Sequence, residues 1–164
     1  MVRRSTAAFA VVVAVIAVVA LLLQTGLWIS LLPVGEYDET TVTVVDGDDE
    51  QLGAVEARVA DSTTKRLVGL SRTDALGPDE GMLFVHGEAE RHAYVMREMD
   101  FPLDIVFLAA NGTITEIHHA SVPSGDGDLR EYPGHGRYVL EVQRGWTNRT
   151  DTAVGDRVRS PVME

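Results

Sequence analysis

The chain has 164 residues, with 25 acidic residues against 14 Lys and Arg, and it contains no cysteine. This length allows one domain with a substantial hydrophobic core beside a short appendage. The acidic surface that the composition implies repels phosphate backbones, which argues against general nucleic-acid binding. The lack of cysteine excludes a disulfide framework and a cysteine-linked lipid anchor.

Residues 7–32 form a long stretch without any charged residue. As a helix it would extend about 39 Å, more than the roughly 30 Å hydrocarbon core of a bilayer. We therefore predict a retained transmembrane anchor over residues 7–32. A cleaved signal peptide is the main alternative, although its apolar region is usually shorter and no small-residue cleavage site stands out. A buried core helix is a third interpretation.

The charges on either side of this segment predict its orientation. Arg3 and Arg4 precede it, whereas Glu36, Asp38 and Glu39 follow it without any base. Positive residues favour the cytoplasmic side of a membrane. We therefore expect residues 1–6 to be a cytoplasmic N-terminus. The segment would pass once through the lipid of the cell membrane and leave the C-terminal domain extracellular.

The part of the chain beyond this segment is more acidic than the whole. All 25 acids lie from Glu36 onward, where only 12 bases are found, so the formal charge of this part is −13. Lys65 is the only lysine. Concentrated salt screens such self-repulsion, so we expect a halophilic source, in particular an archaeon. A genome rich in G and C is an alternative explanation for the arginine bias.

The sequence contains two N-glycosylation sequons, which are relevant only if the domain is extracellular. Asn111 begins an Asn-Gly-Thr triplet and Asn148 begins an Asn-Arg-Thr triplet. Both match the acceptor pattern that is modified outside the cytoplasm. The sequence therefore predicts these two asparagines as glycosylation sites.

The first elements after the apolar segment are a linker and a hairpin. Residues 33–39 contain Pro, Gly and acids and predict a linker to a domain over residues 40–164. Apolar and polar residues alternate over 40–45 and 51–60, on either side of an Asp-Gly turn, which predicts a β-hairpin. Ser62 then offers an N-cap for a short helix.

The remaining residues have mostly strand-like composition with turn signals between the runs. Asn111-Gly112 is the strongest hairpin signal, whereas the Pro- and Gly-rich stretch 121–136 predicts a long irregular loop. Strands joined by hairpins, with one or two short helices, favour an all-β fold, mainly an antiparallel barrel or sandwich. The predicted strands are 80–86, 91–96, 103–109, 113–119 and 137–142, followed by a helical turn over 145–152 and a closing segment over 154–160.

Several motifs in a fixed order give the chain a resemblance to a known family. They are VADSTTKRLVGLSRT, EGMLFV, YVMREMDFPLDIVFL, YPGHGRYVLEV and VGDRV. Over roughly Leu52 to Val158 the chain resembles the DUF192 family of uncharacterised domains. The resemblance implies a small, mostly β domain that is often exported and has no established activity. The chain departs from the family pattern at two places, since the family usually has Trp at the position of Tyr94 and Lys-Asn at Arg97-Glu98.

A candidate ligand-binding site comprises Tyr94, Arg97, Asp104 and Glu141. Pro102 predicts a bend between two strands. An acid such as Asp104 at the start of an apolar strand needs partners, and Arg97 is the nearest cation in the sequence. An ion pair between them that fixes the bend is the favoured interpretation. The functional alternative is a pocket for an anion or polar ligand, built by Tyr94, Arg97 and Glu141 beneath the loop 121–136.

Metal and catalytic signals are weak. Adjacent strand residues point to opposite faces, so His118 and His119 are not expected to ligate one ion together. Neither an H-E-x-x-H motif nor a G-x-S-x-G elbow is present. Asp104 and Glu141 could in principle act as a carboxylate pair in glycoside hydrolysis. We predict no cofactor, no metal site and no catalytic residue. The other histidines, which we interpret as ordinary surface or core residues, are His86, His92 and His135.

These observations together predict a membrane-anchored extracytoplasmic β domain that binds a polar small molecule or an envelope protein, without catalysis. A metal-binding protein or metal-dependent hydrolase is one alternative. A structural module that packs on a partner membrane protein is another.

Overall fold

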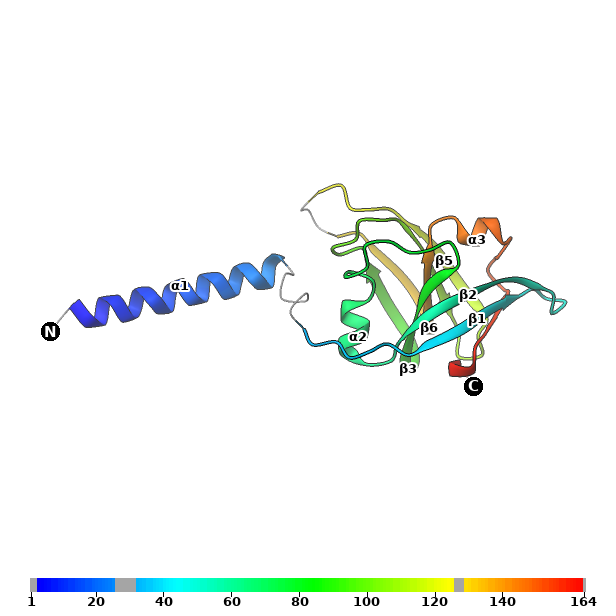
Figure 1. Cartoon of the computed structure of the whole chain (residues 1–164), viewed down its shortest axis with the longest axis horizontal. Helices are drawn as coiled ribbons and strands as arrows, with labels where there is room; N and C mark the ends of the chain where they lie inside the picture. Colours follow the sequence, from blue (N-terminus) through cyan, green and yellow to red (C-terminus); the bar gives the residue numbers. More distant parts are fainter. Residues whose placement is uncertain (1–2, 26–31, 126–128, 164) are drawn as a thin grey trace. The chain divides into compact units, whose positions relative to one another are not determined.

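The structure is a computed structural model that describes residues 3–25, 32–125 and 129–163. It falls into two compact units, Met1–Pro33 and Val34–Glu164. The first contains one helix, and the second contains all the strands (Figure 1).

The first unit is built on helix α1, Arg3–Thr25. Its described side chains, over residues 8–21, are exposed all around the helix. In the part of the chain that the structure describes, no helix is both long and apolar enough to cross a membrane. A helix is therefore confirmed within residues 7–32, but the structure does not show the predicted transmembrane anchor, and residues 26–31 lie outside the described residues.

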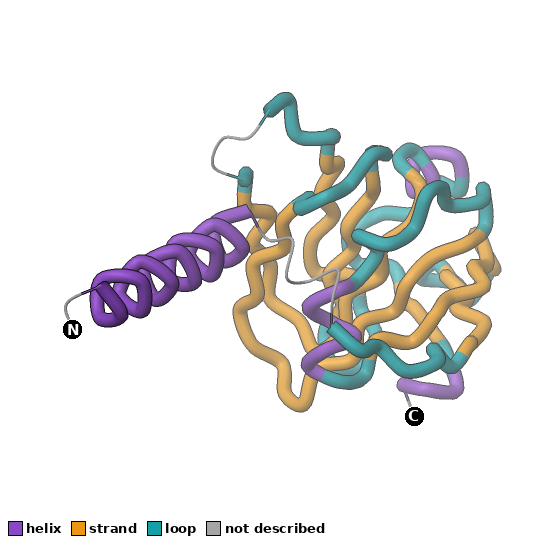
Figure 2. The backbone as a smooth tube through the Cα atoms, turned by 60° about the vertical axis from the view of Figure 1, so that its left-hand side comes forward, coloured by secondary structure: helices purple, strands orange, loops and turns teal. Residues whose placement is uncertain are grey.

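The second unit is a curled sheet in which the strands surround a common interior (Figure 2). Its strand order is β5-β4-β6-β3-β2-β1-β7. The two edges meet where Thr113 bridges Arg157 and the amide of Ile114 donates to the carbonyl of Asp156 at 2.8 Å. The predicted all-β class is confirmed. The strands are β1 Glu39–Val45, β2 Gln51–Ala60, β3 Glu80–Val95, β4 Leu103–Leu108, β5 Ile114–Ala120, β6 Glu131–Gln143 and β7 Arg157–Arg159; the short helices are α2 Thr63–Val68, α3 Trp146–Arg149 and η2 Pro161–Met163.

One pairing departs from the expected hairpin pattern, because β2 and β3 are parallel. Parallel neighbours need a crossover connection, which residues 61–79 supply. The predicted short helix lies within this crossover as α2, and the hydroxyl of Ser62 caps it by accepting from the amide of Lys65 at 3.2 Å.

Strand β3 differs from the prediction in its length. The sequence predicted two separate strands, whereas the chain runs on as one strand whose register against β6 shifts between Val85 and Glu90. Gly87 lies in this irregular part, and nothing lies near the position that a Cβ would take there. The turn-like residues around Gly87 therefore mark a bulge and not a hairpin loop.

Strand β6 corrects a third expectation, because it begins at Glu131 inside the predicted irregular loop 121–136. Gly134 and Gly136 allow close packing here: a Cβ on Gly134 would overlap the ring of Phe107, and one on Gly136 would lie 2.5 Å from the carbonyl oxygen of Leu108. Of the remaining loop, residues 126–128 lie outside the described residues.

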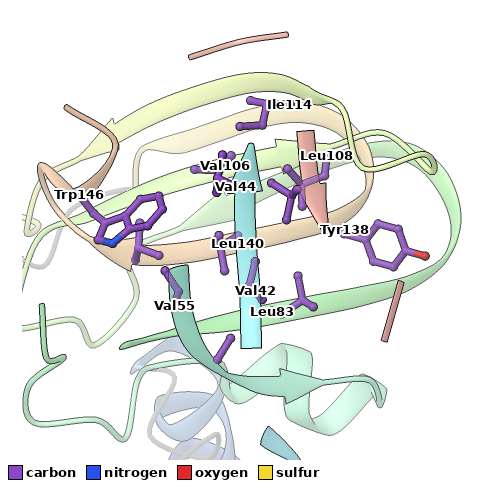
Figure 3. Packing of buried hydrophobic residues seen from close by; sticks show 13 residues of the cluster. Val42, Val44, Val55, Leu83, Val106, Leu108, Ile114, Tyr138, Leu140 and Trp146 are labelled. Carbon is purple, nitrogen blue, oxygen red and sulfur yellow. The ribbon is translucent and has the colours of Figure 1, made fainter. Parts of the chain in front are cut away.

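The sheet has a buried cluster on each face. The inner cluster fills the barrel and draws residues from all seven strands (Figure 3). The outer cluster lies on the opposite face of β3, β4 and β6, where residues of the crossover and of the β3–β4 connection cover it. The inner cluster is Val42, Val44, Val55, Ala57, Leu83, Val106, Leu108, Ile114, Tyr138, Leu140, Val142, Trp146 and Val158. The outer cluster is Ala60, Leu70, Leu76, Met82, Phe84, Met96, Met99, Leu103, Ile105, Phe107, Ala120, Tyr132 and Val139.

Candidate functional site

Glu141 lies in the middle of the sheet on its outer face. On β6 it stands opposite Met82 of β3 and Ile105 of β4, both of which are fully buried in the outer cluster. Because directly opposite residues share a face, its carboxyl group emerges among apolar side chains. The sheet register therefore places an acid where the local pattern calls for an apolar residue.

The Glu141 carboxyl group has little contact with water and no polar partner within residues 32–125 and 129–163. The residue is only 6% exposed. Among the residues that the structure describes, none forms a hydrogen bond or ion pair with this carboxyl group. Burial raises its pKa from 4.5 to about 8. At neutral pH the group is therefore mostly a protonated acid, which can both donate and accept a hydrogen bond.

Tyr94 lies on the same outer face. Its ring meets the rings of Phe84 and Phe107 edge-on, with centroids 5.1 and 5.7 Å apart, respectively. Burial raises the pKa of its hydroxyl, and the nearby Glu141 carboxyl group raises it further. Tyr94 therefore stays protonated at neutral pH and contributes an uncharged polar tip.

The hydroxyl of Tyr94 forms a hydrogen bond of 2.9 Å with Nε2 of His86. The ring of His86 stacks on that of His92, with centroids 3.6 Å apart. Burial, together with the charges of His92 and Arg66, lowers the pKa of His86 to about 4. We call Glu141, Tyr94 and His86 the outer polar cluster, and all three are uncharged at neutral pH.

Asp104 lies on the inner face, away from this cluster. It stands opposite Val142 and is fully buried. Its Oδ2 accepts hydrogen bonds from the amide of Gly145 at 3.0 Å and from Thr147, through the amide at 3.1 Å and the hydroxyl at 2.7 Å. Its Oδ1 lies 2.7 Å from Nδ1 of His119. Asp104 thereby joins the start of α3 to β4 and β5.

The predicted ion pair between Arg97 and Asp104 is wrong. Arg97 is exposed in the connection between β3 and β4, and the guanidinium beside Asp104 is that of Arg144, whose Nε lies 3.6 Å from Oδ1. Proximity in the sequence was misleading because β6 lies between β4 and β3 in the sheet, so its C-terminal end brings Arg144 to Asp104.

The structure separates the four candidate site residues. Tyr94 and Glu141 share the outer face, Arg97 lies in the connection whose Met96 and Met99 join the outer cluster, and Asp104 faces inward. Because Asp104 and Glu141 face opposite sides of the sheet, they cannot flank one scissile bond as a glycosidase pair must.

The adjacent histidines of β5 point to opposite faces, as predicted. His118 lies on the outer face, where its Nε2 is 2.7 Å from the carbonyl oxygen of Pro133. His119 reaches inward to Asp104. Within the described ranges, no group of three or more acidic or histidine side chains is arranged to hold a metal ion.

Sequence reasoning missed His86 and three partners of Asp104. His86 reaches Tyr94 across the bulge of β3, where the register against β6 shifts between Val85 and Glu90, and no sequence signal marks that contact. His119, Arg144 and Thr147 meet Asp104 through sheet order. No local sequence pattern marks these contacts, because Gly145 precedes α3 without a side-chain cap and Thr147 lies inside the helix.

The two predicted glycosylation sites are both exposed. Asn111 lies in the β4–β5 turn, where its Oδ1 accepts from the amide of Thr113 at 3.1 Å, and Asn148 lies in α3. Glycosylation at either site stays a prediction.

Comparison with solved structures identifies two similar proteins. One is described as a "putative transcription regulator" from Sinorhizobium meliloti 1021; it is 28% identical, with a TM-score of 0.68, and the match covers 78% of this chain and 98% of that one. The other is a protein of unknown function from Novosphingobium aromaticivorans DSM 12444; it is 27% identical, with a TM-score of 0.68 and coverage of 78% and 89%.

A search of the curated proteins found no match. The model of the DUF192 family, described as uncharacterized ACR, matches residues 43–160. This range runs from within β1 to just past β7 and so includes nearly the whole barrel. The chain therefore belongs to the DUF192 family.

Proposed function

We propose that this DUF192 domain is a binding module without catalytic chemistry of its own, and that it holds an uncharged polar small molecule at Tyr94 and Glu141. The observation that carries the proposal is the buried Glu141 carboxyl group, which lacks a polar partner among the described residues. Burying a polar group without a hydrogen bond costs about 1–3 kcal/mol. A ligand that bonds to Glu141 recovers this cost, which explains why an acid stands in an apolar cluster.

The protonation states of the cluster favour an uncharged ligand. Glu141 is mostly protonated at neutral pH because its pKa is about 8, and Tyr94 and His86 are neutral as well. Together they offer donors and acceptors but no charge that would pair with an ion. Hydroxyl and amide groups match this surface. Arg97 lies in the connection between β3 and β4, on the same face, and is the candidate residue at the edge of the proposed binding site.

We also propose that residues 7–32 hold the domain at the outer side of the cell membrane. Support comes from the uncharged sequence of this segment and from Arg3 and Arg4 before it. The large apolar side chains of α1 that the structure describes are 48–72% exposed, and such a surface needs a cover of lipid or protein. These residues are Phe9, Val11, Val12, Val13, Val15, Ile16, Val18, Val19 and Leu21.

Nucleic-acid binding is not part of this proposal, even though one similar structure is described as a regulator. The formal charge of −13 from Glu36 onward repels a phosphate backbone.

Calorimetric titration of the full chain in detergent with monosaccharides, polyols and small amides tests the binding site. We expect at least one of these compounds to bind the wild type, and Glu141→Leu to lose at least tenfold in affinity while keeping or raising the melting temperature. Glu131→Leu, at an exposed position of the same strand, serves as the matched control and should bind normally. The proposal is wrong if no compound binds, or if Glu141→Leu binds as well as the wild type.

Protease protection tests the topology separately. Protease added to intact cells should degrade the domain, and its survival until the cells are lysed would place the domain inside the cell.

A further inference from the structure

A second polar site lies around Asp104, on the inner face of the sheet. Oδ1 of the fully buried Asp104 is 2.7 Å from Nδ1 of His119 and 3.6 Å from Nε of Arg144. One buried oxygen atom therefore positions two side chains that can carry positive charge. They come from different parts of the sheet, since His119 is in β5 and Arg144 follows β6.

Both side chains keep functional atoms free on their outer side. His119 and Arg144 are each 39% exposed at the side chain. Nε2 of His119 and the two terminal nitrogens of Arg144 have no hydrogen-bond partner within the described residues. The buried carboxylate lies next to one nitrogen of each group, and both side chains remain partly exposed to solvent.

The charges of this site are unusual for the domain. Oδ2 of Asp104 already accepts three hydrogen bonds from Gly145 and Thr147, so this oxygen is not available to a bound cation. Asp104 carries one negative charge and Arg144 one positive charge, and the imidazole of His119 lies beside them. Two basic side chains gathered on one acid stand out on a domain whose formal charge is −13.

We propose that His119 and Arg144 bind one small oxyanion, either a phosphate group or a carboxylate. A guanidinium group offers paired N–H donors that match two oxygens of such an anion. The imidazole supplies a third donor when protonated. Because both side chains are already anchored on Asp104, they lose less conformational entropy when an anion binds. This site is separate from the outer polar cluster, because Asp104 and Glu141 face opposite sides of the sheet.

Proton NMR of the histidine side chains of the full chain in detergent tests the site without altering it. The probes are inorganic phosphate and acetate, added at constant ionic strength against chloride. We expect one of the five histidine signals to move in a saturable way, and that signal to be missing in His119→Gln. A response to phosphate alone would identify a phosphate site, and a response to both would identify a general oxyanion site.

Arginine variants supply the second measurement. Arg144→Gln should weaken anion binding at least tenfold, whereas Arg144→Lys should retain part of it because the charge remains. Arg91→Gln, at an exposed position of β3, is the matched control and should bind like the wild type. Linear, non-saturating shifts of His119, or equal affinity in Arg144→Gln and Arg91→Gln, would show that the two cations serve only to neutralise Asp104.

Discussion

His119 and Asp104 are joined across neighbouring strands by a hydrogen bond of 2.7 Å, although only His119 reaches the surface. The same carboxylate accepts three hydrogen bonds at the start of α3. Asp104 therefore connects the sheet with helix α3 and, through His119, with the surface.

Asp104→Asn should destabilise the domain strongly. The amide removes the charge and turns one acceptor into a donor that faces the donors of Thr147 or His119. Breaking a buried charged network of this kind costs about 3–5 kcal/mol. Chemical denaturation measures the loss, and Asp100→Asn, at an exposed position in the preceding connection, should change stability by less than about 0.5 kcal/mol. Similar midpoints for both variants would contradict the role given to Asp104.

Glu141 should make the stability of the domain depend on pH. Its pKa rises from 4.5 to about 8 on folding, so the folded state binds more protons than the unfolded state between these values. The contribution is fully present below pH 4.5 and is lost as pH rises through about 8. The slope over this window is at most about 1.4 kcal/mol per pH unit.

Denaturation of the wild type and of Glu141→Gln at several pH values checks this expectation. The variant should lack the part of the slope that Glu141 contributes, because its side chain does not titrate. Identical slopes in the two proteins would show that the carboxyl group is not protonated by burial.

Gly134→Ala should be among the most disruptive small substitutions in the domain. Its new methyl group would overlap the ring of Phe107, which is fixed in the outer cluster. Overpacking of this kind typically costs about 1–3 kcal/mol. Gly87→Ala is the control, since no atom lies within 4 Å of its Cβ position, and thermal melting should separate the two variants clearly. Equal melting temperatures would mean that β6 does not cross Phe107 as described.

The melting temperature should rise with KCl concentration. The domain has a formal charge of −13 from Glu36 onward, and salt shortens the range of the resulting repulsion from about 10 Å at 0.1 M to about 3 Å at 1 M. Scanning calorimetry across this range measures the effect. A melting temperature that is flat or falls with salt would count against adaptation to concentrated salt.

Local patterns predicted much of the fold. The Asn111-Gly112 turn, the Ser62 cap and the helical turn at Trp146 all form where turn and capping chemistry placed them. Each depends on residues within a few positions of one another, which is the range over which backbone preferences act.

The errors arose where distant segments decide the conformation. Glycine is typical of loops, and Gly134 and Gly136 therefore led to the prediction of a loop. They lie in β6 instead, where glycine is needed because the strand passes close to Phe107 and Leu108. Arg144, and not the nearer Arg97, pairs with Asp104 because of the order of strands in the sheet. Sequence alone identified Tyr94 and Glu141 as candidates, but it could not tell that Asp104 faces the other way, since that depends on register.

The contact between Gly112 and Val158 carries a consequence for biogenesis. The amide of Val158 donates to the carbonyl of Gly112 at 2.8 Å, Gly155 and Asp156 bond to Ile114, and β7 pairs with β1, so residues 155–159 close the ring of strands in the described part of the chain. A ribosome delivers these residues after every other strand. The barrel therefore cannot close until β7 has left the ribosome, and until then the edges of β1 and β5 that pair with this segment stay open.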